Sequence, residues 1–335
     1  MEPILRVRNL HKHFRSHWVY RRIEAVRDAS FDIYPGEIFG LLGHNGAGKT
    51  TTMKCILGLI RLTQGEVQFR GQPLTTAAQR ADMGYLPELP YFYDHLTVRE
   101  TLEFLASLTG LRSRLSRGEF AKHVDSTLDR VGLTEKRKAP VRSLSKGLQQ
   151  RLGLAQAIVN DPKLLFLDEP FSGLDPIGRR EFRNIILDLK HAGTTIALSS
   201  HVLSDVQTLC DRVLIMARGH VETTFSIADV GQLFGERFEL VIESVENETL
   251  VSTLRNLEDA DNRSTDPRGH SFCYSDYDKA LEAFVIVSQH GVRVREFRSS
   301  SPDLESIFVS VTERARGGAQ QAPAISAPND GGRHA

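Results

Sequence analysis

The chain has 335 residues, 40% of them hydrophobic and 25% charged, which suits one large domain and a second, small one with ordinary cores. Its 42 basic residues balance its 42 acidic residues, so charge gives no support for a general binder of nucleic acid or of anionic membranes. No apolar run approaches the ~20 residues that cross a bilayer, and the N-terminus lacks a signal-peptide pattern. The scattered cysteines, without metal-type spacing, fit a reducing cytosol and are predicted to be packing residues: Cys55, Cys210 and Cys273.

A loop of the nucleotide-phosphate-binding type runs from Gly43 to Thr50, with the pattern G-x-x-x-x-G-K-[ST]. A predicted buried strand over residues 37–42 leads into it, and a predicted apolar helix leaves it, as this motif requires. Lys49 is placed to reach the β- and γ-phosphates of ATP or GTP, and Thr50 offers a hydroxyl to Mg²⁺. The predicted nucleotide-binding residues here are Gly43, His44, Asn45, Gly46, Ala47, Gly48, Lys49, Thr50 and Thr51.

The sequence predicts a helical subdomain over residues from about 89 to 160. Thr97 with Glu100, and Ser116 with Glu119, match capping boxes, in which a hydroxyl and a carboxylate satisfy N–H groups at the start of a helix. The sequence therefore predicts that helices begin just after Thr97 and Ser116.

Two adjacent carboxylates, Asp168 and Glu169, follow the short apolar run over residues 164–167. A buried parallel strand would deliver them at its carboxyl end. We expect Asp168 to hold Mg²⁺, directly or through water, and Glu169 to polarise an attacking water as a general base. A solvated turn after an ordinary strand is the alternative, and the phosphate loop elsewhere in the chain makes it the weaker one.

Three further motifs complete an order that identifies a family. The stretch LSKGLQQR lies at 144–151, SGLD at 172–175 and SSH at 199–201. Over roughly residues 4–225, the chain resembles the ATP-binding subunit of ABC transporters, whose motifs run in the same order. The resemblance implies an α/β fold, a P-loop NTPase domain of the ABC ATPase type with a mixed sheet core and a helical subdomain, over residues 1–230.

The resemblance also implies roles for several residues. Ser145 and Gly147 begin a predicted helix whose free N–H groups suit phosphate, and in this family they close over ATP held by a partner in a head-to-tail dimer. His201 is the switch residue that contacts the γ-phosphate and holds Glu169 and the attacking water. Asp175 lies at the dimer interface, although a simple turn role also satisfies its sequence. The expected catalytic residues are Glu169, His201 and Lys49.

Three positions depart from the commonest family pattern. Glu88 replaces the usual glutamine of the Q-loop and can still ligate Mg²⁺, so the expected metal ligands are Thr50, Glu88 and Asp168. Lys146 and Leu148 replace the first glycine and the final glutamine of the signature, and with the YLPE form of the Q-loop they resemble type-two exporters. The aromatic residue that stacks on adenine is predicted to be Phe14, with Trp18 and Tyr20 as alternatives.

The aromatic run Tyr91-Phe92-Tyr93 has two open interpretations. In this family it lies near the groove where a membrane subunit docks a short coupling helix, and aromatic grooves do anchor partners. The same side chains could equally be ordinary core.

After Gly219 the motifs stop and a small α+β domain is predicted over residues 235–313. Its expected elements are strands at 238–242, near Phe272 and at 292–297, and helices from about Leu250 and over 280–289. A short terminal helix over 302–309 resembles one found in type-two exporters, with dimerisation, regulation or simple packing as its use. Residues 314–335 lack periodicity and are predicted to be disordered.

The sequence thus predicts an ATP- and Mg²⁺-dependent ATPase subunit of an ABC exporter, peripheral on the inner face of the cell membrane. Its expected partners are a separate polytopic permease and a second copy of itself or a homologous ATPase, with no nucleic acid. The alternative is a soluble ABC ATPase, although neither two ATPase domains nor a long coiled coil is present. A catalytically dead scaffold is disfavoured because Lys49, Asp168, Glu169 and His201 are all in place.

Overall fold

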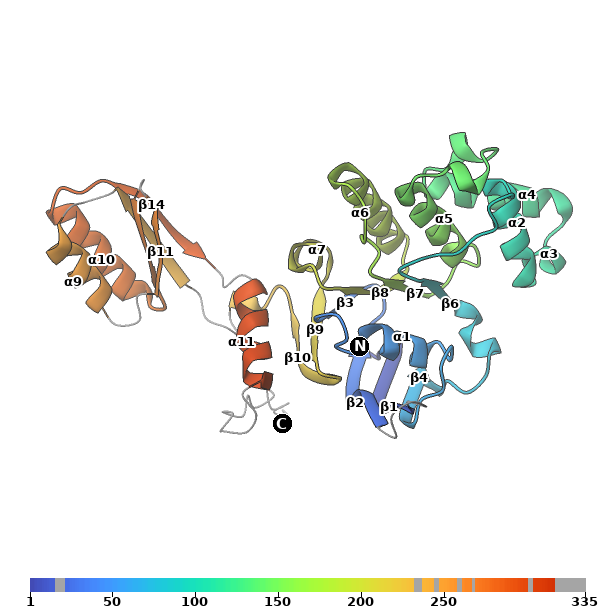
Figure 1. Ribbon diagram of the computed structural model, residues 1–335, viewed down its shortest axis with the longest axis horizontal. Coiled ribbons are helices and arrows are strands. Elements are labelled where there is room, and N and C mark those ends of the chain that lie inside the picture. Colours follow the sequence, from blue (N-terminus) through green and yellow to red (C-terminus); the bar gives the residue numbers. More distant parts are fainter. Residues whose placement is uncertain are drawn as a thin grey trace, which may run out of the picture.

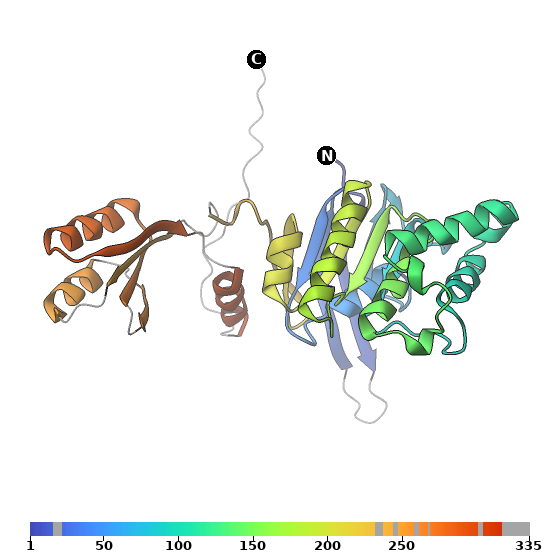
Figure 2. The ribbon, with the colours of Figure 1, turned by 90° about the horizontal axis from the view of Figure 1, so that it is seen from above.

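A computed structural model describes residues 1–15, 22–231, 237–243, 247–257, 261–266, 269–300 and 304–316. Figure 1 shows a large N-terminal part with two sheets and a helical region, and a small C-terminal sheet covered by two helices. Between these two parts lies helix α11, which Figure 2 also places beside the large part. Trp18 and Tyr20, the two alternatives to Phe14 as the adenine contact, lie outside the described residues.

The central sheet holds six strands in the order β10-β9-β3-β8-β7-β6. Neighbouring strands pair in parallel except for β10, which is antiparallel to β9. Strands β3, β7 and β8 are buried at every residue, as parallel strands covered on both faces should be. The strands are β3 (Ile38–Leu42), β6 (Met83–Leu86), β7 (Leu164–Asp168), β8 (Thr195–Ser200), β9 (Arg212–Ala217) and β10 (His220–Ser226).

A second, antiparallel sheet has the order β2-β1-β4-β5. Its apolar face shares one core with helix α1 (Lys49–Ile56) and with Phe39 and Leu41 of β3, so α1 is packed between the two sheets. This packing fixes the start of α1 at the end of β3. The strands are β1 (Leu5–Arg15), β2 (Arg22–Ile33), β4 (Gln64–Phe69) and β5 (Gln72–Pro73).

Helices cover the opposite face of the central sheet and form the helical region. Both predicted capping boxes are confirmed: the Thr97 and Ser116 hydroxyls accept from the N–H groups of Glu100 and Glu119, whose carboxylates accept in return. These bonds start α2 and α4, which pack against α5. The helices are α2 (Val98–Leu108), α3 (Leu111–Arg114), α4 (Arg117–Arg130), α5 (Lys146–Ile158), α6 (Pro176–His191) and α7 (Leu203–Leu209).

The C-terminal sheet has the order β12-β13-β11-β14 and the chain order β-α-β-β-α-β, the ferredoxin-like arrangement. Its core lies between the sheet and helices α9 and α10. Strand β12, with the polar sequence DNRSTD, has no apolar alternation, and for that reason the sequence did not predict it. The elements are β11 (Arg237–Glu243), α9 (Glu248–Asn256), β12 (Asp261–Asp266), β13 (Gly269–Tyr274), α10 (Tyr277–Gln289) and β14 (Val294–Ser300).

Helix α11 (Leu304–Arg316) is longer than predicted, and residues 314–316, assigned to the disordered tail, are helical. None of the helices in the described part of the chain has the length and apolar composition that a bilayer-spanning helix requires. All three cysteines are buried, which confirms them as packing residues. Burial raises the pKa of Cys55 to about 11, so this thiol stays protonated near neutral pH.

Candidate functional site

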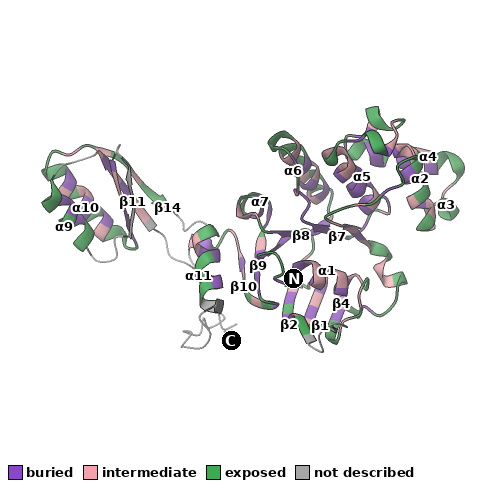
Figure 3. Ribbon diagram, viewed as in Figure 1, coloured by how far each residue is buried: buried purple, intermediate pink, exposed green. Residues whose placement is uncertain are grey.

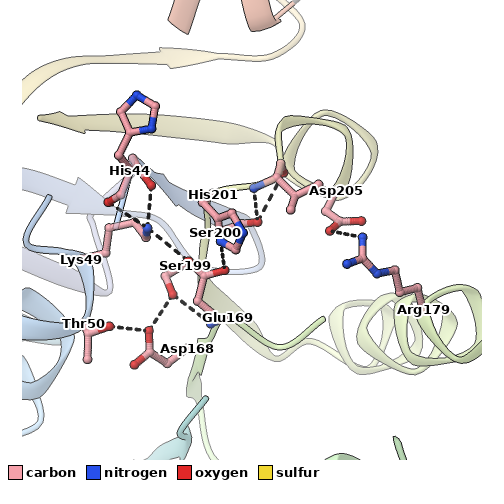
Figure 4. A network of polar contacts seen from close by, with 12 residues as sticks. His44, Lys49, Thr50, Asp168, Glu169, Arg179, Ser199, Ser200, His201 and Asp205 are labelled. Carbon is pink, nitrogen blue, oxygen red and sulfur yellow. Dashed lines mark hydrogen bonds and ion pairs between the residues drawn. The ribbon is translucent and has the colours of Figure 1, made fainter. Parts of the chain in front are cut away.

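The carboxyl ends of three adjacent strands carry the site. Strands β3, β8 and β7 are neighbours in the sheet, and the phosphate loop, His201 and the Asp168–Glu169 pair lie at or directly after their ends. Parallel strands end at one edge, so residues more than 100 positions apart in sequence meet there. Figure 4 shows this group of side chains.

The phosphate loop is held in a tight curve by glycine. A Cβ at Gly43 would lie 2.5 Å from the Met216 carbonyl oxygen, and Gly48 has φ +110, which side chains rarely adopt. Within this curve the Lys49 Nζ donates to the carbonyl oxygen of Gly43 at 2.6 Å. The loop is therefore wrapped around its own lysine.

Lys49 and Glu169 form a buried ion pair. The Nζ lies 3.1 Å from Glu169 Oε1, and the two side chains are only 6% and 11% exposed. Glu169 Oε1 lies within ion-pair distance of Lys49 but accepts no hydrogen bond, so a buried acceptor position is still open. A buried lysine with its charge held by a carboxylate can exchange that partner for phosphate.

Asp168 is the centre of a hydrogen-bond network. Its Oδ1 accepts from Thr50 Oγ1 at 2.9 Å and from Ser199 Oγ at 2.7 Å, and its Oδ2 accepts from the Tyr85 hydroxyl at 3.3 Å. Burial, helped by the charge of Asp168, raises the pKa of Tyr85, so its hydroxyl stays a donor. The sequence predicted Thr50 and Asp168 together but missed Ser199 and Tyr85.

Two contacts besides the Lys49 ion pair orient Glu169. Its backbone N–H donates to Ser199 Oγ at 2.9 Å, and its Oε2 lies 2.8 Å from His201 Nδ1. An ionised carboxylate has only acceptors, so Nδ1 carries the hydrogen and Nε2 is left as an acceptor or as a site for a second proton. The Glu169 backbone has φ +46, a strained value for a residue with a side chain, of a kind found at functional sites.

A cavity of about 430 Å³ lies in front of this network. Glu88, from the loop after β6, lines this cavity, as does Ile23 of β2. Phe14 is not among the lining residues, but it pairs with Ile23 across the strands and so shares its face of the sheet. The lining residues are Ile23, Glu24, Ala25, His44, Asn45, Gly46, Ala47, Gly48, Lys49, Thr50, Thr51, Glu88, Glu169 and His201.

The signature residues lie elsewhere. Ser145 caps α5, its hydroxyl accepting from the Leu148 N–H at 3.4 Å, so the predicted helix start is confirmed. Ser145, Gly147 and Asp175 line a second cavity of about 330 Å³, which shares no lining residue with the first. Asp175 caps α6 by accepting from the Gly178 N–H at 2.7 Å. In one chain, the signature and the phosphate loop therefore face different cavities.

The aromatic run divides between core and surface. Phe92 is 7% exposed and joins the core beneath α2, whereas Tyr91 is 89% exposed and Tyr93 is 52% exposed. The Tyr93 ring meets Phe104 edge-on with centroids 6.0 Å apart. Each of the two interpretations therefore fits a different residue of the run.

Comparisons with known proteins agree in one family. A family model described as "ABC transporter" matches residues 26–172. An uncharacterized ABC transporter ATP-binding protein of Synechocystis sp. is 39% identical over 87% of this chain and 79% of its own length. One of Bacillus subtilis is 33% identical over 85% of this chain and 93% of its own. A solved ATP-binding subunit of an ABC transporter is 30% identical, with TM-score 0.59, covering 69% of this chain and 93% of that one.

Proposed function

Because the chain belongs to the family of ABC transporter ATP-binding proteins, we propose that it hydrolyses Mg²⁺-bound ATP to drive a separate polytopic membrane subunit, in an exporter. The observation that carries this proposal is the single network joining Lys49, Glu169 and His201 at the edge of the central sheet. Such a network supplies a phosphate contact, a base and a sensor of the γ-phosphate.

The oxygen atoms around Asp168 fit a magnesium ion. Thr50 and Glu88 both line the 430 Å³ cavity, and Thr50 Oγ1 lies 2.9 Å from Asp168 Oδ1 behind it. All the ligand atoms that these side chains offer are oxygens, as Mg²⁺ prefers. Thr50, Asp168 and Glu88 would hold the ion. Such an ion would offset the negative charge of the phosphate groups.

Removal of Mg²⁺ should abolish turnover. With excess EDTA we expect ATP hydrolysis by the purified chain to fall by about 100-fold or more, because phosphate charge is no longer offset. Phosphate release is measured with EDTA and after Mg²⁺ is restored. Asp168→Asn should lose turnover even with Mg²⁺, whereas Tyr85→Phe, which removes only the hydroxyl at 3.3 Å, should keep most of it. Full activity in EDTA would refute the magnesium role.

Glu169 and His201 account for the hydrolytic step. We propose that Glu169 accepts a proton from the attacking water through Oε1, once Lys49 has left that oxygen to contact phosphate. His201 donates to Oε2 and so holds the carboxylate, which would leave its Nε2 free to contact the γ-phosphate. Lys49 must first exchange Glu169 for phosphate, which makes the base available only when nucleotide is present.

The separation of the two cavities supports a head-to-tail dimer. Ser145 and Gly147 line no part of the phosphate-loop cavity, so the ATP that they contact would belong to a second copy or to a homologous ATPase. Each ATP would lie between one phosphate loop and one signature.

We propose the inner face of the cell membrane as the location of the chain. We also propose Phe14, which lies on the same face of the sheet as Ile23, as an adenine contact.

We propose that the exposed aromatic residues before α2 dock the membrane subunit. Tyr93 contacts Phe104 of α2, and α2 carries two exposed apolar side chains, Phe104 at 42% and Leu108 at 70%. Exposed aromatic side chains of this kind often anchor protein partners.

Tyr91→Ala should weaken membrane recruitment several-fold and leave ATP affinity unchanged, because the side chain is exposed and is not among the residues that line the 430 Å³ cavity. Phe92→Ala is the matched control. Loss of this buried ring should lower the thermal stability instead, as core truncations do. The fraction of the chain that sediments with membranes measures recruitment. Equal sedimentation of Tyr91→Ala and wild type would refute the docking surface.

A further inference from the structure

Helix α11 packs on the nucleotide-binding part of the chain. Leu304, Ile307 and Phe308 are at most 6% exposed and share a core with Val206 of α7 and Phe225 of β10. Figure 3 shows buried residues on α11, and Figures 1 and 2 both place the helix beside the large part and apart from the small C-terminal sheet. Helix α11, the last described segment, therefore packs against elements that come much earlier in the sequence.

One residue of α11 touches the phosphate loop itself. The Phe308 ring meets the His44 ring edge-on, with centroids 4.9 Å apart and planes at 64°. In Figure 4 the His44 ring points away from Lys49 and from the carboxylates. The backbone of His44 faces the loop: its carbonyl oxygen accepts from the Ala47 N–H at 3.1 Å and from Lys49 Nζ at 3.4 Å. His44 therefore joins α11 to the hydrogen bonds that shape the loop.

The helix supports the loop from outside the nucleotide cavity. A small cavity of about 210 Å³ lies between residues 44–47 of the loop, residues 216–218 and Thr312 of α11. Thr312 is 5% exposed, and its hydroxyl donates to the Phe308 carbonyl oxygen at 2.8 Å. No described residue of α11 lines the 430 Å³ cavity in front of Lys49, so α11 leaves the ATP position open.

The same helix also contacts α7, which begins two residues after His201. One helix thus touches both the loop that would hold the phosphates and the helix that follows the switch residue. We propose that α11 is a brace for the nucleotide site and that Phe308 is a positioning residue that acts on ATP through His44. This inference rests on the ATP binding proposed above and extends it to the C-terminal region.

A consequence follows by linkage. If docking of α11 raises ATP affinity, ATP must strengthen the docking of α11 by the same factor.

Phe308→Ala should weaken ATP binding about three- to tenfold, the range expected for loss of one aromatic pair. The KM for ATP should rise in proportion while kcat stays within about twofold, because the base and the metal ligands are untouched. Leu304→Ala is the control: Leu304 is equally buried on α11 but is outside the contact with His44, so ATP affinity should stay within about twofold. Equal weakening by both variants would show general packing and overturn the proposal.

A double-mutant cycle isolates the ring contact. His44→Ala should weaken ATP binding at least as much as Phe308→Ala, and the double variant should be no worse than His44→Ala alone. Additive losses would overturn the proposal.

Should Phe308→Ala fail to fold, hydrogen exchange of α11 in the wild-type chain decides instead: ATP should slow it, and an unchanged rate would count against the brace. A wild-type chain that binds no ATP would refute the proposed function, whereas normal ATP binding with a neutral Phe308→Ala would refute only the brace.

Discussion

Glu169→Gln should slow ATP turnover by about 100-fold or more while leaving ATP binding intact, because the amide cannot accept a proton from the attacking water. The substitution keeps the shape of the side chain and can still meet His201, whose Nδ1 lies 2.8 Å from Oε2. The substitution removes the negative charge that pairs with Lys49, so the affinity of Lys49 for phosphate should not fall. Single-turnover hydrolysis and equilibrium ATP binding, measured on the same preparation, separate the two effects.

The same variant should accumulate as an ATP-bound dimer. If each ATP lies between the phosphate loop of one copy and Ser145 and Gly147 of another, blocked hydrolysis leaves the dimer closed. Light scattering with ATP and Mg²⁺ should report twice the monomer mass for Glu169→Gln, and Ser145→Arg in the same background should return it to the monomer. A Glu169→Gln chain that turns over at the wild-type rate, or stays monomeric with ATP, would contradict the mechanism.

Lys49→Ala should abolish tight ATP binding, with a loss of about 100-fold or more, because a charge-assisted phosphate contact and the loop's internal hydrogen bond to Gly43 disappear together. It should also lower thermal stability, since Glu169 is 11% exposed and its carboxylate would be left buried without its cation. Binding of a fluorescent ATP analogue and the melting temperature measure the two losses.

Two variants separate binding from stability. Lys54→Ala, on the same helix α1, removes a positive charge outside the site and should change neither quantity appreciably. Lys49→Ala combined with Glu169→Gln should regain much of the lost stability, because the uncompensated charge is gone, but should not regain ATP binding. Near-normal ATP affinity in Lys49→Ala would contradict the role of the lysine.

The features that the sequence predicted, in the site and elsewhere, are those encoded by short local patterns. The phosphate loop, the Asp168–Glu169 pair and the two capping boxes each depend on neighbours within a few residues, so their spacing carries the geometry. The fold could be expected because the order of these motifs resembles that of ABC transporter ATP-binding subunits.

The parts that the sequence missed depend on contacts across the chain. Tyr85 and Ser199 reach Asp168 only because β6 and β8 flank β7 in the sheet, and their residue types are too common to signal this. The contact of Phe308 with His44 joins residues from opposite ends of the sequence. Tyr91 and Phe92 are adjacent and equally aromatic, and only packing decides which one faces the core.

The central claim is that this ATPase drives a membrane partner, and its most direct test is purification of the tagged chain from gently solubilised membranes of its own host. Mass spectrometry of the purified material identifies what accompanies it. The account predicts a polytopic membrane protein in stoichiometric amount, and this protein should be depleted by Tyr91→Ala. Ribosomal or DNA-repair proteins without any membrane partner would contradict the account and favour a soluble ABC ATPase.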